Sequence, residues 1–153
     1  MLLRLLLFLV INFSALAIGG LFTSSGVTST WYMQLNKAPW TPPGWVFGAA
    51  WFSIMVCYSI YLSILWKAAP QWQGQITVLF ALQFILNVSW NPVFFTFHQT
   101  SFALFIILAL TILVGIFLIQ YRSILKWNSL LILPYFSWLL IATSLNAYAV
   151  WNN

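Results

Sequence analysis

Residues 31–51 read WYMQLNKAPWTPPGWVFGAAW and connect two long apolar runs. Three prolines in this stretch remove backbone donors and fix φ, which makes the connector stiff: Pro39, Pro42 and Pro43. A stiff backbone holds large ring faces in place at low entropic cost, and the rings here are those of Trp31, Tyr32, Trp40 and Trp45. We therefore predict a structured cap over one end of a membrane bundle, with the next helix beginning near Val46.

The composition excludes an ordinary soluble fold. Apolar residues make up 63% of the chain, charged residues 3%, and the mean hydropathy is +1.00. We predict an all-α membrane protein, a bundle of five transmembrane helices with a structured aromatic, proline-rich loop between the first two. Residues 1–153 would form a single transmembrane domain, with helices at 2–22, 46–66, 75–97, 101–120 and 129–150.

The apolar runs also carry local signals. The first run is too long for the apolar core of a signal peptide and lacks a convincing cleavage site, so we interpret it as a spanning helix. Ala15 and Gly19 stand four apart in it and would let another helix, or a second copy of the chain, approach closely. Pro134 is expected to kink the fifth helix.

The charges are few and all positive. The chain has no Asp or Glu and a net charge of +5, which excludes carboxylate acid–base chemistry, carboxylate proton relays and hard-cation sites. So few cations make no nucleic-acid-binding patch. With five spans, one face holds Arg4, Lys67, Arg122 and Lys126, and the other holds Lys37. The positive-inside rule then places the N-terminus in the cytoplasm, and the aromatic loop and C-terminus outside.

Polar and aromatic residues recur at helical spacing in three of the predicted spans. One face of the third span holds Asn87, Trp90, Asn91 and Phe94; matching faces hold Trp138, Ala142 and Leu145, and Phe47, Trp51 and Met55. These faces could enclose a flat apolar ligand, with Asn87 and Asn91 binding its carbonyl or carboxylate groups. The alternative is that the tryptophans are packing or interface anchors and the asparagines only join helices.

Metal and haem ligation have little support. His98, the single histidine, falls in a turn at the outer edge of the predicted bundle, and no second axial ligand is evident, which favours an exposed side chain. One histidine and the distant Cys57 make no metal-ligand set, so no metal is expected.

Four stretches resemble the translocator protein/tryptophan-rich sensory protein family (TspO, also called the peripheral-type benzodiazepine receptor). They are Trp31-Tyr32 with KAPWTPPGWVFG at 37–48 and Trp51; NVSWNPVFF at 87–95; LPYFSW at 133–138; and ATSLN at 142–146 with Trp151 and Asn153. The resemblance implies a five-helix bundle that commonly forms homodimers. It also implies an internal pocket, lidded by the first loop, for porphyrins (protoporphyrin IX or haem) and for isoquinoline carboxamides and benzodiazepines, with no cofactor required.

Carried over by motif, the resemblance implies the pocket residues Tyr32, Pro42, Phe47, Trp51, Asn87, Trp90, Asn91, Trp138, Ala142 and Leu145. It ties Trp51 and Trp138 to porphyrin photochemistry and Ala142 to ligand affinity. The chain departs from the family at Asn36, where an acidic residue is common. No basic residue follows Tyr148, so the cholesterol motif of animal members is absent, which argues against sterol binding and favours a bacterial cell membrane.

Four functions are compatible with these features. The favoured one is tetrapyrrole binding with a sensory, regulatory or transport role in tetrapyrrole or stress handling. The alternative enzyme would degrade porphyrin in light through Trp51 or Trp138, since no hydrolytic or metal site is present. A transporter is disfavoured because the spans lack ionisable groups and broken helix pairs. The fourth is a scaffold without a small-molecule ligand.

Overall fold

The computed structural model describes residues 2–153, which form helices joined by short turns and one longer loop. Five segments are long and apolar enough to cross a membrane. They are built on α1 (Leu2–Gly26), α3 (Gly44–Ala68), α4 (Gln73–Phe95), α5 (Thr100–Gln120) and α7 (Leu133–Trp151). The predicted fold class, a five-helix membrane bundle, is confirmed.

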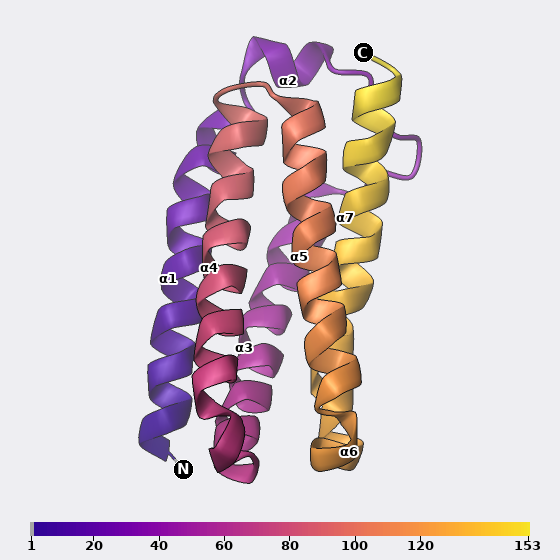
Figure 1. Cartoon of the computed structure of the whole chain (residues 1–153). Helices are drawn as coiled ribbons and strands as arrows, with labels where there is room; N and C mark the ends of the chain where they lie inside the picture. The colour runs from indigo at the N-terminus through magenta and orange to yellow at the C-terminus, as the bar shows by residue number, and fades with distance from the viewer. Residues whose placement is uncertain (1) are drawn as a thin grey trace.

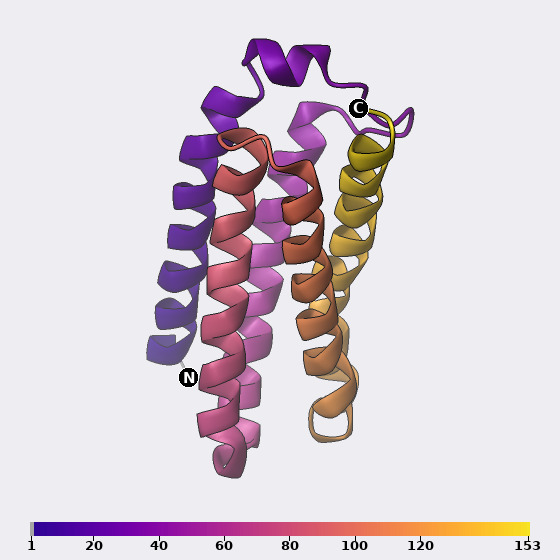
Figure 2. The same ribbon diagram turned by 45° about the horizontal axis from the view of Figure 1, so that its top comes forward.

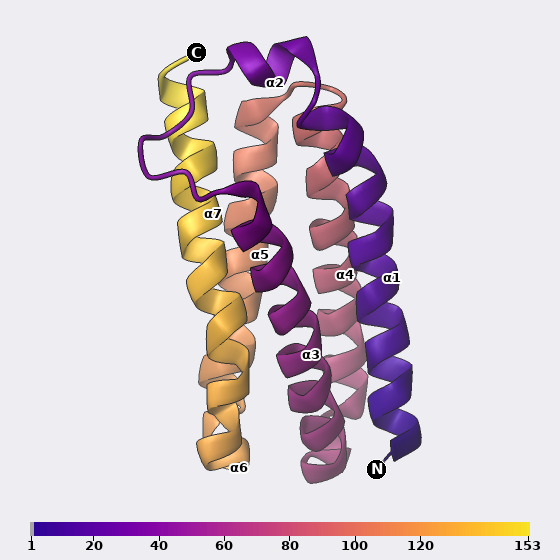
Figure 3. The same ribbon diagram turned by 180° about the vertical axis from the view of Figure 1, so that it is seen from behind.

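The long helices form one closed ring, and α1 begins at the opposite end of the bundle from the end of α7 (Figure 1). Around the ring, α1 packs between α3 and α4, and α5 packs between α4 and α7. The ring closes where α3 meets α7 and the 3₁₀ segment before it, η2 (Lys126–Ile132). Here α3 contacts η2 more extensively than it contacts α7. Seen from behind, α3 slants across the gap between α1 and α7 (Figure 3).

The first helix is longer than predicted. It continues through residues 23–26, which the sequence indicated as a polar connector, and ends at Gly26. The hydroxyls of Thr23 and Ser25 donate to the carbonyls of Gly19 and Leu21, at 3.1 and 3.3 Å, so these small polar residues are satisfied within the helix. Ala15 and Gly19 are buried against the rest of the chain, and a Cβ on Gly19 would lie 2.6 Å from Asn91 Nδ2 of α4. Gly19 therefore lies against α4 of the same chain, which confirms that this pair lets another helix approach, and the burial of both residues within the chain argues against a contact between two copies there.

The connector after α1 contains a short helix that was not predicted, α2 (Thr30–Gln34). The Ser29 side chain caps it by accepting a hydrogen bond from the Tyr32 backbone N–H at 3.2 Å. The α2 helix lies across the end of the bundle, and the segment after it passes beside α7 before α3 begins at Gly44 (Figures 2 and 3). The expected structured cap is present.

The third and fifth spans also differ from prediction. After the 3₁₀ turn η1 (Pro70–Trp72), α4 begins at Gln73 and ends at Phe95 rather than residue 97, because the Pro92 carbonyl accepts the next two backbone N–H groups. A second short helix, α6 (Arg122–Leu125), precedes η2, so α7 begins at Leu133 rather than residue 129. Pro134 therefore occupies the first turn of α7, where its missing N–H breaks no helical bond, and the predicted kink is wrong.

The bundle interior is aromatic and crossed by a few polar bonds. Tyr58, Phe117 and Tyr135 are fully buried at its centre. Asn12 of α1 donates to Ser59 of α3 at 2.8 Å, and other bonds of this kind join α3 to α5 (Tyr61 hydroxyl to the Phe117 carbonyl, 2.8 Å) and α4 to α7 (Gln83 amide to the Tyr135 hydroxyl, 2.7 Å). These bonds satisfy polar groups that the bilayer could not solvate and fix which helices are neighbours.

Candidate ligand-binding site

The aromatic loop is bound to the bundle at both of its ends. Near α2, the Trp31 ring stacks on His98 with centroids 4.1 Å apart, and the Tyr32 ring packs against Phe95 at 5.5 Å. Lys37 Nζ lies 4.6 Å from the centroid of the Tyr32 ring. Burial raises the pKa of the Tyr32 phenol, so this side chain stays neutral over the physiological range.

Farther along, the loop is attached to α7. The Trp40 indole N–H donates to the Ser144 hydroxyl at 3.1 Å. The Asn36 backbone N–H donates to the Asn153 side-chain oxygen at 2.8 Å, and the Asn153 amide returns a bond to the Asn36 carbonyl at 3.3 Å. Pro42, one of the expected site residues, lies half-buried in the stretch between this attachment and α3. The Trp40 ring also packs edge to face against Tyr148 at 5.4 Å, so exposed polar bonds and an aromatic contact together hold the loop on α7.

Three of the expected site residues, Phe47, Trp51 and Trp138, lie at the seam between α3 and α7, under the loop. The Phe47 and Trp138 rings pack edge to face with centroids 5.2 Å apart. Trp51, one turn below Phe47, packs against Tyr135 at 5.9 Å. Ala142 and Leu145 follow Trp138 along α7, and both are half-buried. The α3 and α7 faces that the sequence singled out therefore do come together.

The Trp138 indole gives this seam an unusual polar group. Trp138 is only 7% exposed, and its N–H has no hydrogen-bond partner among the described residues. A buried donor without a partner costs about 1–3 kcal/mol. The hydroxyls of Tyr58, Ser63 and Tyr121 are also buried without a partner among the described residues, so Trp138 is distinguished by its place among the rings of the seam. The seam thus combines large apolar ring faces with one free donor.

Of the three expected site residues on α4, Asn91 and Trp90 are hydrogen-bonded to neighbouring helices, whereas Asn87 is not. Asn91 is held by α1, because its side-chain oxygen accepts from Thr23 at 2.8 Å, and its amide donates to the Asn87 carbonyl at 3.2 Å. Asn91 therefore joins helices, the alternative weighed for it. The Asn87 side chain is buried, and no hydrogen bond joins its amide to another described residue. The Trp90 indole N–H donates to Asn146 at 3.0 Å.

Two residues of this region were not singled out as site residues. Asn146 holds Trp90 and donates in turn to the Thr100 carbonyl at 2.8 Å, so it links α4, α5 and α7. It stands eight residues after Trp138, on the same helix face, and that spacing was available as a signal. Tyr135, under Trp51, stands three residues before Trp138 on the same face, but the sequence alone does not show which ring it meets.

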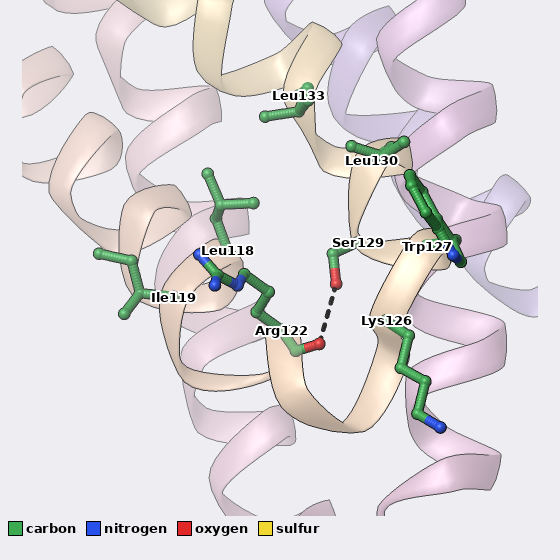
Figure 4. Close-up of a pocket in the computed structure, with 8 residues that line it drawn as sticks. All are labelled: Leu118, Ile119, Arg122, Lys126, Trp127, Ser129, Leu130 and Leu133. Atoms are coloured by element: carbon green, nitrogen blue, oxygen red, sulfur yellow. Dashed lines mark hydrogen bonds between the residues drawn. The ribbon is translucent and has the colours of Figure 1, made fainter.

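Two open hollows lie at the other end of the bundle. One has a volume of about 800 Å³ between the end of α5 and η2, and Figure 4 shows the eight side chains that line it. Another, of about 450 Å³, is lined by Ser63, Ile64, Lys67, Ala68 and Asn128. In the seam under the loop, the chain's own rings occupy the space. A ligand there would have to displace Phe47 and Trp138 from each other.

Comparison with known proteins agrees with this arrangement. The TspO/MBR family profile matches residues 7–152. A tryptophan-rich sensory protein of Cereibacter sphaeroides is 34% identical over 125 residues, which cover 80% of this chain and 78% of the relative. The tryptophan-rich protein TspO of Archaeoglobus fulgidus is 37% identical over 128 residues, covering 84% and 82%. The human translocator protein is 29% identical over 126 residues, covering 80% and 74%.

Proposed function

Because the chain belongs to the TspO/MBR family and is an integral, multi-pass membrane protein, we propose that it binds a tetrapyrrole between α3 and α7, beneath the aromatic loop. The observation that carries the proposal is the buried Trp138 indole N–H without a partner, set among aromatic faces. Protoporphyrin IX or haem is the ligand class, and the role is sensory, regulatory or in transport.

A porphyrin matches this seam in shape and in polarity. Its flat ring can replace the edge-to-face contact between Phe47 and Trp138 with stacking on both rings. A carboxylate of the ligand would accept from the Trp138 N–H and remove the penalty of that unpaired donor. Asn87, which is buried on α4, offers a further amide to a polar group of the ligand.

The charge at this end suits a ligand with carboxylates. Lys37 is the cation in the loop, and its ammonium group already lies over the Tyr32 ring at 4.6 Å. The chain has no Asp or Glu, so no acidic side chain would repel a porphyrin carboxylate. Entry requires the loop to separate from Ser144 and Asn153, and closure afterwards would shield the ligand from water.

The proposal is tested by titrating protoporphyrin IX into the detergent-solubilised protein and following the absorbance of the porphyrin. Unlike tryptophan fluorescence, this signal does not change with the number of tryptophans that a variant retains. Trp51→Phe combined with Trp138→Phe should weaken affinity about fivefold or more, because the loss of one hydrogen bond or of one stacked face is worth about 1 kcal/mol. The matched control is Trp72→Phe with Trp127→Phe, two exposed tryptophans at the other end. Equal affinities of the two double variants would refute the proposed site.

Light-driven porphyrin degradation is a second candidate, favoured by the position of both tryptophans. Trp51 contacts Tyr135, which in turn packs against Tyr58 at 5.3 Å. An indole that gives an electron to the photoexcited porphyrin would recover one from these phenols, and the reduced porphyrin would react with dissolved dioxygen as the oxidant. Illumination of the porphyrin complex should give new product absorbance in the native protein and much less in Trp51→Phe with Trp138→Phe. Identical product yields from the variant and the native protein would exclude this activity.

A further inference from the structure

The hollow beside η2 combines an apolar wall with a basic rim. Leu118 and Ile119 of α5 face Leu130 and Leu133 across it, and Arg122 and Lys126 lie at its edge (Figure 4). Arg122 runs alongside Leu118, whereas the Lys126 side chain points away from Arg122 (Figure 4). The wall is therefore apolar toward the membrane interior and cationic where the helices end.

These two cations have no counter-ion within the chain. The sequence contains no Asp or Glu, and no hydrogen bond joins either side-chain head group to another residue in the range 2–153. The C-terminal carboxylate follows α7 and lies at the opposite end of the bundle (Figure 1). Arg4 and the Lys67 of α3 add further positive charge to the same end. An anion that neutralises Arg122 and Lys126 must come from outside the chain.

The turn that presents the cations is held in a fixed shape. The backbone N–H groups of Ile124 and Leu125 both donate to the Tyr121 carbonyl, at 3.2 and 3.0 Å. Lys126 follows with φ 51° and ψ −121°, a conformation that side-chain-bearing residues seldom adopt and that costs on the order of 1–3 kcal/mol. The surrounding structure thus maintains a strained lysine at the rim of the hollow.

The position of the hollow identifies the source of the anion. Trp127 is 84% exposed and Trp72 is 43% exposed at this end, as is typical of aromatic residues at the boundary between lipid tails and water. At that depth an acyl chain meets the leucine and isoleucine wall, and a phosphate meets the cations. We propose that the hollow between α5 and η2 binds an anionic glycerophospholipid of the bilayer, with its phosphate on Arg122, the exposed Lys126 side chain turning toward that phosphate from the same rim, and one acyl chain against Leu118, Ile119, Leu130 and Leu133.

Native mass spectrometry of the whole protein tests this directly. Phosphatidylglycerol and phosphatidylcholine with identical acyl chains are titrated in a mild detergent against the native protein and against Arg122→Gln with Lys126→Gln. Since each cation near a membrane surface contributes about fivefold to the binding of an anionic lipid, the variant should bind phosphatidylglycerol about 25-fold more weakly. Phosphatidylcholine affinity should change less than about twofold, because its headgroup carries no net charge.

The matched control removes two charges from the same end but outside the hollow, with Arg4→Gln and Lys67→Gln. It should keep phosphatidylglycerol affinity within about twofold of the native value, and an equal loss in both variants would overturn the proposal in favour of a diffuse charge effect. Glycerol phosphate, which has no acyl chains, should bind far more weakly than phosphatidylglycerol; equal binding would also overturn it. If the double variant does not fold, Lys126→Gln alone should still weaken binding about fivefold.

Discussion

Gly26, the last residue of α1, lies so close to α4 that replacing it with alanine should force the two helices apart. A Cβ at this position would lie 2.5 Å from both Cβ and Cγ of Phe95 on α4. Phe95 Cβ belongs to the root of its side chain and cannot move away without moving the α4 backbone. The φ angle of Gly26 is negative, so the strain comes from the contact and not from the backbone conformation.

The size of the effect follows from a comparison with Gly20 on the same helix. Overpacking a tight contact costs about 1–3 kcal/mol, and a clash at the root of a side chain lies at the upper end of that range. At Gly20 nothing lies within 4 Å of the added methyl group, so Gly20→Ala should be stabilising by about 1 kcal/mol through helix propensity. The two alanine variants should therefore differ by about 3 kcal/mol or more.

Thermal unfolding in detergent measures this difference. Cys57 is the only cysteine, so a thiol-reactive fluorophore reports unfolding at one defined position. For a chain of this length each 1 kcal/mol shifts Tm by about 2–4 °C, so Gly26→Ala should melt about 6–12 °C below Gly20→Ala. Melting temperatures within about 2 °C of each other would refute the close packing of α1 on α4 at Phe95.

Three further outcomes are expected. Gln83→Leu and Tyr135→Phe should each destabilise by about 1–3 kcal/mol in denaturant melts because each leaves a buried polar group unpaired, while the double variant should recover most of the loss; additive losses would contradict this. Trp40→Phe removes the indole bond to Ser144, so limited proteolysis should cleave the loop faster while Tm stays within about 2 °C. The pKa of Tyr32 is raised above 10.0 by burial, so its neutral form stabilises the loop fully below pH 10.0, and this contribution is lost as pH rises further. The rate of proteolytic cleavage of the loop should therefore rise above pH 10.0, and it should rise less in Tyr32→Phe than in the native protein. Equal rises in the two proteins would contradict a stabilising role for the neutral Tyr32 side chain.

The sequence predicted the class of fold because the bilayer constrains it strongly. Runs of about twenty apolar residues admit few structures other than spanning helices, and that constraint is confirmed for all five. Helix ends were less predictable, since they depend on individual hydrogen bonds. Thr23 and Ser25 suggested a connector but bond back onto their own helix. Pro134 suggested a kink but lies in the first turn of α7, because the preceding residues form a 3₁₀ segment that apolar composition does not reveal.

The candidate site could be predicted one helix face at a time but not as an assembly. Helical spacing alone put Trp138 and Ala142 on one face, and Phe47 and Trp51 on another, and those faces meet. Spacing within a helix does not say which neighbour a polar side chain will reach. Asn91 was expected to contact ligand, yet Thr23 of α1 occupies its side-chain oxygen, a contact between residues 68 apart in the sequence.

Phe95 connects the loop, the helix contact at Gly26 and the candidate site. Its ring packs against Tyr32 of the loop at 5.5 Å and against Trp90 of α4 at 5.8 Å, and its root lies against Gly26. Trp90 is held by Asn146 on α7, the helix that also carries Trp138. A chain of contacts from Tyr32 to Asn146 couples the two residues energetically only if both of them favour the same conformational change. A double-mutant cycle that measures porphyrin affinity with Tyr32→Leu, Asn146→Ala and both together tests this coupling. An interaction free energy of about 0.5 kcal/mol or more would link closure of the loop to the position of α7. Additive effects of the two substitutions would show that the loop and α7 act independently.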